Sequence, residues 1–307
     1  MSHHPHTIVL LGRGALARDV ARQLAAQGGD RRVLTISTTA DAAPGEPFVD
    51  PSDVGSSRAL AEHLASGNIQ MLVVLALSES PVTPSQPWLH DRAVTDMVVS
   101  AIGRCSELGS KPPPLIVLSS TAVYGVAAAS PLLFHERSAC IAVSERSACE
   151  RWAQGLRAAE EELRSLQESH RIRVGVLRAA PTLGGPLDST LEALLRSRFP
   201  VRVLGYDPPV QPLAYEDLVQ AVVLAIEQGS AEVLNIVGRS VVPLSRLLAM
   251  AGVYAPPLPG AVADRIAPAA MDGARLRWRT VADGRRAMQA LGYRPERSLE
   301  EALRARR

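Results

Sequence analysis

Two glycines and an alanine near the start of the chain have the spacing of a turn that holds phosphate. Residues 12–17 read G-x-G-x-x-A, between a run of aliphatic residues and a segment with helical periodicity. Gly12 permits a tight turn, Gly14 lets the backbone approach a pyrophosphate, and Ala17 allows close packing of helix and strand. The first N–H groups of the helix then face the phosphates. The alternative is a glycine turn that only joins strand and helix, but the flanking segments favour a dinucleotide site.

The residues about twenty positions beyond such a turn help to decide which dinucleotide is bound. An acidic residue there binds the ribose 2′-hydroxyl of NAD, but residues 35–39 read T-I-S-T-T. The hydroxyls of Ser37 and Thr38 can bind a 2′-phosphate, and Arg13 adds a cation inside the turn. The sequence therefore favours NADP over NAD, unless Arg13 points into solvent.

An aspartate farther along is a candidate for binding the adenine ring. The segment from Phe48 to Asp53 follows an expected third strand, and the carboxylate of Asp50 can accept a hydrogen bond from the adenine amino group. The alternative is an ordinary helix cap made by Asp53. We therefore assign Asp50 to the expected cofactor site.

A further segment carries a family resemblance. Residues 118–125 read L-S-S-T-A-V-Y-G, and with them the chain resembles the extended short-chain dehydrogenases/reductases of the NAD-dependent epimerase/dehydratase type. The likeness continues through short matches at residues 75–76, 176–178, 211–219, 233–238 and 291–295. The glycine turn departs from the family's G-x-x-G-x-x-G, because Leu11 stands where its first glycine falls. This departure resembles the atypical branch of the family.

The resemblance implies an acid/base pair that this sequence lacks. In the family, a tyrosine four residues before a lysine exchanges a proton with a substrate oxygen that a serine or threonine orients, and Ser120 matches this orienting residue. Two registers are open for the pair: Ile141 with Glu145, or Ala142 with Arg146. Neither register contains a tyrosine or a lysine. Arg146 can still hold a cofactor ribose or phosphate without transferring a proton.

Other titratable groups could replace the missing pair. The candidates nearest in the sequence are Tyr124, His135, Glu136, Cys140, Tyr206 and Tyr215. His135 is the best chemical substitute because the pKa of histidine lies near neutrality, although a solvated histidine is the commoner state in a loop. Cys140 has no base nearby in the sequence, and we expect it to be a buried structural cysteine. Ser120 and His135 are therefore the predicted catalytic residues.

Strands and helices are expected to alternate around these residues. The expected strands are 7–11, 32–36, 71–77, 115–118 and 172–177, and the expected helices are 15–26, 58–65, 92–108 and 144–168. Prolines at 81–87 and 112–114 mark connections, and the first of these is long enough for a mobile active-site loop. The alternation predicts an α/β fold with a Rossmann-type doubly wound parallel sheet.

The alternation weakens after residue 178. Prolines and glycines interrupt it at residues 184–186, 207–209 and 256–257. We therefore expect a NAD(P)-binding Rossmann domain over residues 1–178 and a smaller substrate-binding lobe over residues 179–307, with some of its elements returning to the sheet. A small-molecule substrate would lie between the two, at the carboxyl ends of the strands.

The composition narrows the expected partners. The chain has 33 basic and 31 acidic residues without a long block of one charge, which argues against nucleic acid. Its three cysteines form no C-x-x-C pair, which argues against a disulfide framework or a zinc site and fits a reducing cytoplasm. The longest apolar runs are too short for a membrane helix. The resemblance also implies a homodimer through the two long helices.

Three functions are consistent with this pattern. The first is a reductase or isomerase that acts on a small molecule with NAD(P) but without the usual tyrosine and lysine. The second is a catalytically inactive dinucleotide-binding protein that senses the cofactor, or keeps it as a structural ligand, and binds a protein partner. The third is a lyase or cyclase in biosynthesis that uses no cofactor.

Overall fold

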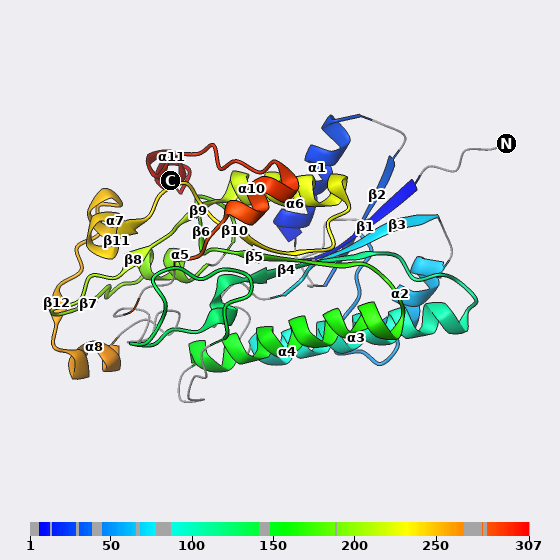
Figure 1. Cartoon of the computed structure of the whole chain (residues 1–307), viewed down its shortest axis with the longest axis horizontal. Helices are drawn as coiled ribbons and strands as arrows, with labels where there is room; N and C mark the ends of the chain where they lie inside the picture. The colour runs from blue at the N-terminus through cyan, green and yellow to red at the C-terminus, as the bar shows by residue number, and fades with distance from the viewer. Residues whose placement is uncertain are drawn as a thin grey trace.

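A parallel sheet of six strands forms the centre of the protein (Figure 1). The computed structural model describes residues 6–12, 14–28, 31–38, 45–65, 68–77, 87–140, 148–187, 189–266, 278 and 281–306. The strands are β1 (His6–Gly12), β2 (Arg31–Ser37), β3 (Ile69–Leu75), β4 (Leu115–Ser120), β5 (Val174–Ala179) and β10 (Val233–Ile236). Their Val, Ile and Leu side chains are mostly buried because helices cover both faces of the sheet.

The order of the strands reverses beside β1. This order is β10-β5-β4-β3-β1-β2, and all neighbouring pairs are parallel. The chain runs outward from β1 to β2 and then returns to β3 on the other side of β1. Such a reversal leaves a crevice at the carboxyl ends of the two strands between which it occurs. Here these ends are Gly12 of β1 and Leu75 of β3.

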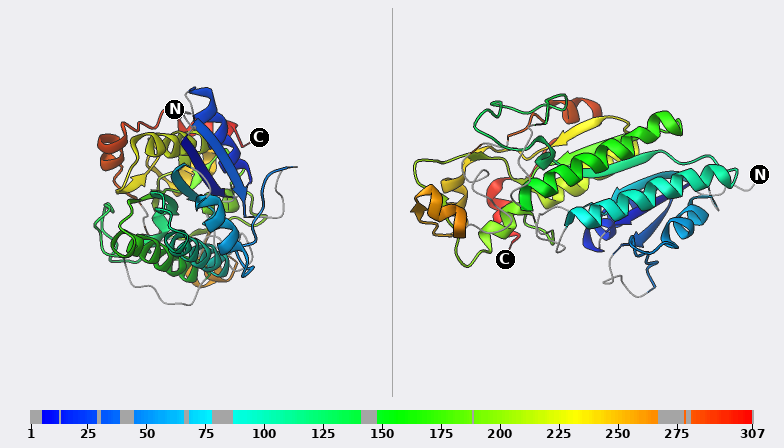
Figure 2. Two further views of the ribbon diagram at one scale, coloured as in Figure 1. Left: turned by 90° about the vertical axis from the view of Figure 1, so that its right-hand side faces the viewer. Right: turned by 90° about the horizontal axis from the view of Figure 1, so that it is seen from below.

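Helices form a layer on each face of the sheet. One layer contains α1 (Gly14–Ala26), α6 (Tyr215–Gln228) and α10 (Arg285–Leu291), and the other contains α2 (Ser56–Ala65), α3 (Pro87–Glu107) and α4 (Ala148–Ser169) (Figure 1). The long helices α3 and α4 lie side by side (Figure 2). Within the described ranges, no helix combines the length and the apolar character needed to cross a bilayer.

The smaller elements gather at the end of the molecule away from the N-terminus (Figure 1). They are η1 (Thr121–Tyr124), β6 (Thr182–Leu183), α5 (Thr190–Leu195), β7 (Arg202–Val203), β8 (Pro209–Val210), β9 (Leu213–Ala214), β11 (Val242–Pro243), α7 (Leu244–Met250), β12 (Pro257–Leu258), α8 (Gly260–Ile266) and α11 (Leu299–Arg304). A second hydrophobic core joins many of them, whereas β10 completes the main sheet. The boundary at residue 178 stays a prediction.

The predicted fold class is confirmed, and the five expected strands match β1 to β5 with shifts of one or two residues at their ends. The main error at a helix end concerns α3, which begins at Pro87 instead of Arg92. Proline suits the first turn of a helix because the N–H that it lacks has no partner there. Residues 81–86 of the expected loop, and residues 144–147 at the start of the helix expected over residues 144–168, lie outside the described residues.

Of the third strand that we expected before Phe48, the described residues contain one bridge, and residues 39–44 lie outside the described residues. Phe48 forms an isolated parallel bridge with Ser37, the last residue of β2. The carbonyl of Pro47 accepts the N–H of Ser37 at 2.8 Å, and the N–H of Val49 donates to the Ser37 carbonyl at 2.9 Å. The segment around Pro47 therefore lies along β2 where a full edge strand would be, and the third strand in chain order is β3.

Gly175 in β5 provides a test of the packing between β5 and the segment before β10. A side chain at this position would collide with the carbonyl oxygen of Ser230, whose carbon would lie 3.1 Å from the new Cβ. We expect Gly175→Ala to lower the free energy of unfolding by about 1–3 kcal/mol, measured by urea denaturation.

Gly103→Ala in α3 is the matched control. The added Cβ would meet only the Nε2 of His170, at 3.9 Å, and alanine is the better helix former. This variant should be at least as stable as the parent. Equal stability of Gly175→Ala and the parent would contradict the packing described.

Candidate functional site

The glycine turn lies at the crevice beside β1. A Cβ added to Gly12 would lie 2.9 Å from the Cβ of Leu75 and 3.3 Å from the Cβ of Ala17. Position 12 therefore requires a glycine because β1, β3 and α1 pack closely there. This requirement adds to the tight turn expected from the sequence. Gly14 begins α1 with φ of +39°, in the region that favours glycine. The first N–H groups of α1, which have no partner within the helix, lie next to the carboxyl end of β1, where the strand order reverses. Arg13 lies outside the described residues.

The end of β2 adjoins this turn. Ser37 and Thr38 are both buried, and the N–H of Thr38 donates to the carbonyl of Gly12 at 3.1 Å. The hydroxyl oxygen of Thr38 is buried and has no hydrogen-bond partner among the described residues. A buried hydroxyl without a partner is costly, so this atom marks a place where a ligand would supply the missing hydrogen bond. The residues present therefore fit a dinucleotide with its phosphates on α1 and its ribose beside β2.

An ion pair that the sequence did not suggest lies in the same region. Arg18 of α1 places Nη1 3.5 Å from Oε2 of Glu46, and the Glu46 side chain is only 6% exposed. Glu46 precedes Pro47, so it belongs to the segment that lies along β2. The nitrogen Nη1 of Arg18 is buried and makes no hydrogen bond within the described part of the chain. Arg18 is four residues after Gly14 and so lies on the same side of α1, which the sequence could have indicated. The approach of Glu46 could not be indicated, because it depends on the shape of an irregular segment.

Asp50 shapes a turn in the described structure. Its Oδ1 accepts the N–H of Ser52 at 2.9 Å, and its carbonyl accepts the hydroxyl of Ser56 at 2.6 Å. Asp53 acts similarly through the N–H of Gly55 at 3.0 Å, just before α2 begins. Asp50 is exposed at this turn, so its second carboxylate oxygen remains sterically accessible, and its role toward adenine stays a prediction.

Ser120 lies at the carboxyl end of β4 and begins the helix η1. Its Oγ accepts the N–H of Ala122 at 3.2 Å, which leaves the hydroxyl proton available for donation. Ser120 borders a small cavity of about 30 Å³. The described residues around it are Leu118, Ser119, Ser120, Thr121, Ala122, Trp152, Ala179, Ala180, Pro181, Thr182, Ser189, Thr190 and Leu218. These supply hydroxyls and apolar groups but no carboxylate or imidazole.

Thr182 adds a second unsatisfied hydroxyl at this cavity. Its side chain is buried, and Oγ1 has no hydrogen-bond partner among the residues that the structure describes. The backbone carbonyl of Thr182 accepts the hydroxyl of Ser189, which also begins α5 by accepting the N–H of Glu192. The backbone here is therefore fixed while the Thr182 hydroxyl remains available.

The face of α4 directed at the sheet places an indole beside the Ser120 cavity and engages its one carboxylate, Glu160, in the ion pair with Arg178. Trp152, Leu156 and Glu160 are four residues apart and hence share one side of the helix, and all three are buried. Trp152 borders the cavity, and Glu160 reaches the neighbouring Ser119. The two registers that we expected for the acid/base pair, and with them Arg146, fall within residues 141–147, outside the described residues.

All five tyrosines and the single lysine of the chain lie in described segments, and none borders the cavity. The hydroxyls of Tyr124, Tyr215 and Tyr293 donate to Asn235, Asp19 and the Val237 carbonyl respectively. Tyr206 and Tyr254 are exposed. Lys111 lies before the amino end of β4, whereas Ser120 is at its carboxyl end, and the six residues of the strand span roughly 17 Å. The lysine is therefore at the end of the strand opposite Ser120.

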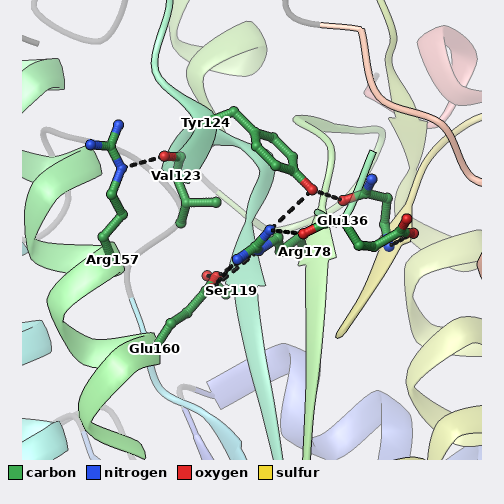
Figure 3. A network of polar contacts seen from close by, with 8 residues as sticks. Ser119, Val123, Tyr124, Glu136, Arg157, Glu160 and Arg178 are labelled. Atoms are coloured by element: carbon green, nitrogen blue, oxygen red, sulfur yellow. Dashed lines mark hydrogen bonds and ion pairs between the residues drawn. The ribbon is translucent and has the colours of Figure 1, made fainter. Parts of the chain in front are cut away.

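A buried ion pair fixes α4 against the sheet (Figure 3). The guanidinium of Arg178, in β5, binds Glu160 of α4 through Nη2 and Oε2 at 2.7 Å, with Nε 3.1 Å from the same oxygen. The Ser119 hydroxyl donates to the other oxygen, Oε1, at 2.5 Å. The Glu160 carboxylate is thus held by two neighbouring strands of the sheet at once.

Arg178 extends the network to Tyr124 (Figure 3). Its Nη1 donates to the Tyr124 hydroxyl at 3.1 Å, and this hydroxyl donates to Oδ1 of Asn235 at 2.7 Å. The Tyr124 ring stacks on Phe134 with centroids 4.9 Å apart. Burial raises the pKa of Tyr124, despite the opposing effect of Arg178. Tyr124 is therefore a buried structural residue and is unsuited to exchange protons with a ligand.

His135 and Cys140 are both exposed. His135 is exposed beside Asp283, and it is not among the residues that border the Ser120 cavity. Its proposed role as a proton carrier stays a prediction that this placement does not favour. Cys140 is exposed, so our expectation of a buried cysteine was wrong. The segment before the helix leaves it at the surface, whereas Cys105 and Cys149 are buried.

Comparison with known proteins identifies the family. Residues 8–237 match the profile of the NAD dependent epimerase/dehydratase family, so the chain belongs to this family. A search of curated protein sequences gave no significant match.

Solved structures share the fold at low sequence identity. UDP-glucose-4-epimerase from Stenotrophomonas maltophila, with bound NAD and formylated UDP-arabinopyranose, has a TM-score of 0.73 at 17% identity, covering 98% of this chain and 96% of that one. UDP-glucose 4-epimerase from Brucella ovis, in complex with NAD, has a TM-score of 0.72 at 18% identity, with 98% and 97% covered. The dTDP-glucose 4,6-dehydratase from Bacillus anthracis, in complex with NAD, has a TM-score of 0.69 at 13% identity, with 98% and 94% covered.

Glu160→Gln tests the ion pair. The substitution keeps the shape of the side chain but leaves the buried guanidinium of Arg178 without a counter-charge. We expect the free energy of unfolding to fall by about 3–5 kcal/mol, measured by urea denaturation.

Glu161→Gln, one residue along on the exposed side of α4, is the control and should change stability by less than about 0.5 kcal/mol. A loss at position 160 no greater than that at position 161 would show that the pair contributes little to the fold.

Proposed function

We propose that this protein binds a nicotinamide dinucleotide at the turn of residues 12–17 and does not use the tyrosine-and-lysine chemistry of its family. The observation that carries the proposal is the juxtaposition of the glycine turn with the buried hydroxyl of Thr38, which has no hydrogen-bond partner among the described residues. Family membership and solved relatives that hold NAD support the same ligand. In this account the cofactor is held as a sensed or structural ligand.

Each residue of the site has a separate role in binding. The N–H groups at the start of α1 bind the pyrophosphate, and Gly14 keeps the approach to them free of a side chain. Gly12 and Ala17 allow α1 to lie close to the sheet, so that these N–H groups reach the crevice. Thr38 donates to or accepts from the adenosine ribose. When bound, the dinucleotide brings a nicotinamide ring that can accept or donate hydride.

The surroundings of Ser120 argue against the proton transfer of an epimerase or dehydratase. That step needs a group whose pKa can be brought near neutrality. Among the described residues, the cavity offers only serine and threonine hydroxyls, and α4 presents Trp152 and Leu156. The one lysine lies beyond the amino end of β4, at the end of the strand opposite Ser120. Without a proton carrier, binding of the cofactor is separated from the family's reaction.

Gly14→Asp tests the site directly. The substitution places a side chain and a negative charge where the pyrophosphate would bind, at a residue whose φ is positive. We expect the affinity for NADH to fall at least about 100-fold in a fluorescence titration, because both steric exclusion and charge repulsion act.

Gly28→Asp is the matched control. Gly28 follows the other end of α1, also has a positive φ, and has open space around its Cα. The control therefore carries the same added charge at a residue that also has a positive φ, and it should bind NADH as the parent does. Unchanged binding by Gly14→Asp would place the dinucleotide elsewhere.

A second candidate function is a reductase or isomerase in which water replaces the tyrosine. The Thr182 hydroxyl, which has no partner in the described part of the chain, favours it, because this hydroxyl and Ser120 border one cavity with room for a water molecule. Ser120 would donate its proton in a hydrogen bond to a substrate oxygen, and the water would exchange the proton. The substrate would be a small molecule, and solved relatives that hold UDP-sugars make sugar nucleotides the first class to test.

The second candidate predicts turnover that depends on Ser120. NADH or NADPH oxidation would be followed by absorbance with a panel of carbonyl compounds and sugar nucleotides. Ser120→Ala should reduce any observed rate at least about 10-fold while the affinity for the dinucleotide stays within twofold. Oxidation that survives loss of this hydroxyl would remove Ser120 from the mechanism. If neither dinucleotide raises the melting temperature, the cofactor-free lyase or cyclase becomes the favoured function.

A further inference from the structure

A carboxylate lies beside the end of β2 but belongs to a later segment of the chain, at Glu46. In Rossmann domains that bind NAD, a carboxylate near the end of the second strand accepts hydrogen bonds from the ribose hydroxyls. Here the end of β2 is formed by Ser37 and Thr38, both uncharged. The segment around Pro47 lies along this end, and Glu46 is part of this segment.

Three contacts position Glu46 beside the turn. The carbonyl of the next residue, Pro47, accepts the N–H of Ser37 at 2.8 Å. The N–H of Thr38 in turn donates to Gly12 at 3.1 Å, which joins the end of β2 to the glycine turn. Arg18, one turn into α1, lies 3.5 Å from the Glu46 carboxylate. The carboxylate is therefore enclosed between α1 and the end of β2, on the side where the adenosine ribose would lie.

We propose that Glu46 selects NAD over NADP by its contact with the adenosine ribose, and that Arg18 holds its carboxylate in place. The proposal rests on the proposed dinucleotide site. It reverses the preference expected from the sequence alone, which weighed Arg13, Ser37 and Thr38 without Glu46.

The chemistry of the two ribose forms explains the direction. A ribose diol can donate two hydrogen bonds to a carboxylate, and hydrogen bonds to a charged group are the stronger kind. A 2′-phosphate carries close to two negative charges and would approach a carboxylate that is only 6% exposed to screening solvent. The pairing with Arg18 offsets part of this repulsion, so the hydrogen bonds that the carboxylate accepts from the ribose diol carry most of the preference for NAD. The unpartnered hydroxyl of Thr38 can bind either form and so does not discriminate.

Loss of the carboxylate changes the balance in a defined way. Glu46→Gln removes the charge that repels a 2′-phosphate and frees the guanidinium of Arg18, which suits phosphate. The same substitution weakens the hydrogen bonds from the ribose diol. The affinity for NADH should therefore fall and the affinity for NADPH should rise, and the rise should depend on Arg18.

The test is a titration of the full chain with NADH and with NADPH, followed by fluorescence. We expect the parent to bind NADH at least about 10-fold more tightly than NADPH, and Glu46→Gln to move this ratio about 100-fold toward NADPH. Glu46→Gln combined with Arg18→Gln should lose the gained affinity for NADPH. Glu46→Asp, which keeps the charge, should retain the preference for NADH.

Glu62→Gln is the matched control, because Glu62 forms an exposed ion pair with Arg58 on α2, away from the turn. It should leave the ratio unchanged. Tighter binding of NADPH by the parent, or a ratio within twofold of the parent's in Glu46→Gln, would overturn the proposal while leaving the dinucleotide site intact. If the parent binds neither dinucleotide, the proposed function itself fails, and this inference fails with it.

Discussion

The ion pair between Arg178 and Glu160 is the interaction on which the arrangement around Ser120 depends. Two charges in the core are stable only when each is paired and hydrogen-bonded, because their desolvation is costly. Here Ser119 and Tyr124 supply the further hydrogen bonds. Hydrogen bonding to Glu160 and its charge raise the pKa of Arg178 overall, although burial acts in the opposite direction. The need to satisfy both charges fixes the rotation of α4 against β4 and β5.

This rotation has a direct consequence for chemistry. With Glu160 turned toward Ser119, the residue eight positions earlier on the same side of α4 is Trp152, which meets the cavity beside Ser120. The contact that stabilises the fold therefore also places an indole at the cavity beside Ser120. The crevice at β1 and β3 is built from Gly12, Gly14 and the end of β2, and it does not depend on α4. Cofactor binding and proton transfer thus rest on different parts of the molecule.

The sequence predicted the sheet and the glycine turn because both follow from local patterns. Aliphatic runs identify strands buried on both faces, and glycine spacing identifies a close approach of α1 to β1. The sequence could not indicate Glu46, because its position depends on how the irregular segment around Pro47 lies along β2. Thr182 was equally hidden, since no periodicity reveals that a buried hydroxyl lacks a partner. The spacing of Trp152, Leu156 and Glu160 was visible, but its meaning required knowing which side of α4 faces the sheet.

The central claim is that a dinucleotide binds between the start of α1 and the end of β2. Hydrogen–deuterium exchange with and without saturating NADH tests it most directly, because it locates the ligand without altering the protein. The account predicts slower exchange in peptides that cover the start of α1 and residues 36–38, where N–H groups and neighbouring backbone would be shielded. Peptides from α3 and α4 should exchange as before. Protection confined to α3 and α4, or no change at the turn, would contradict the account.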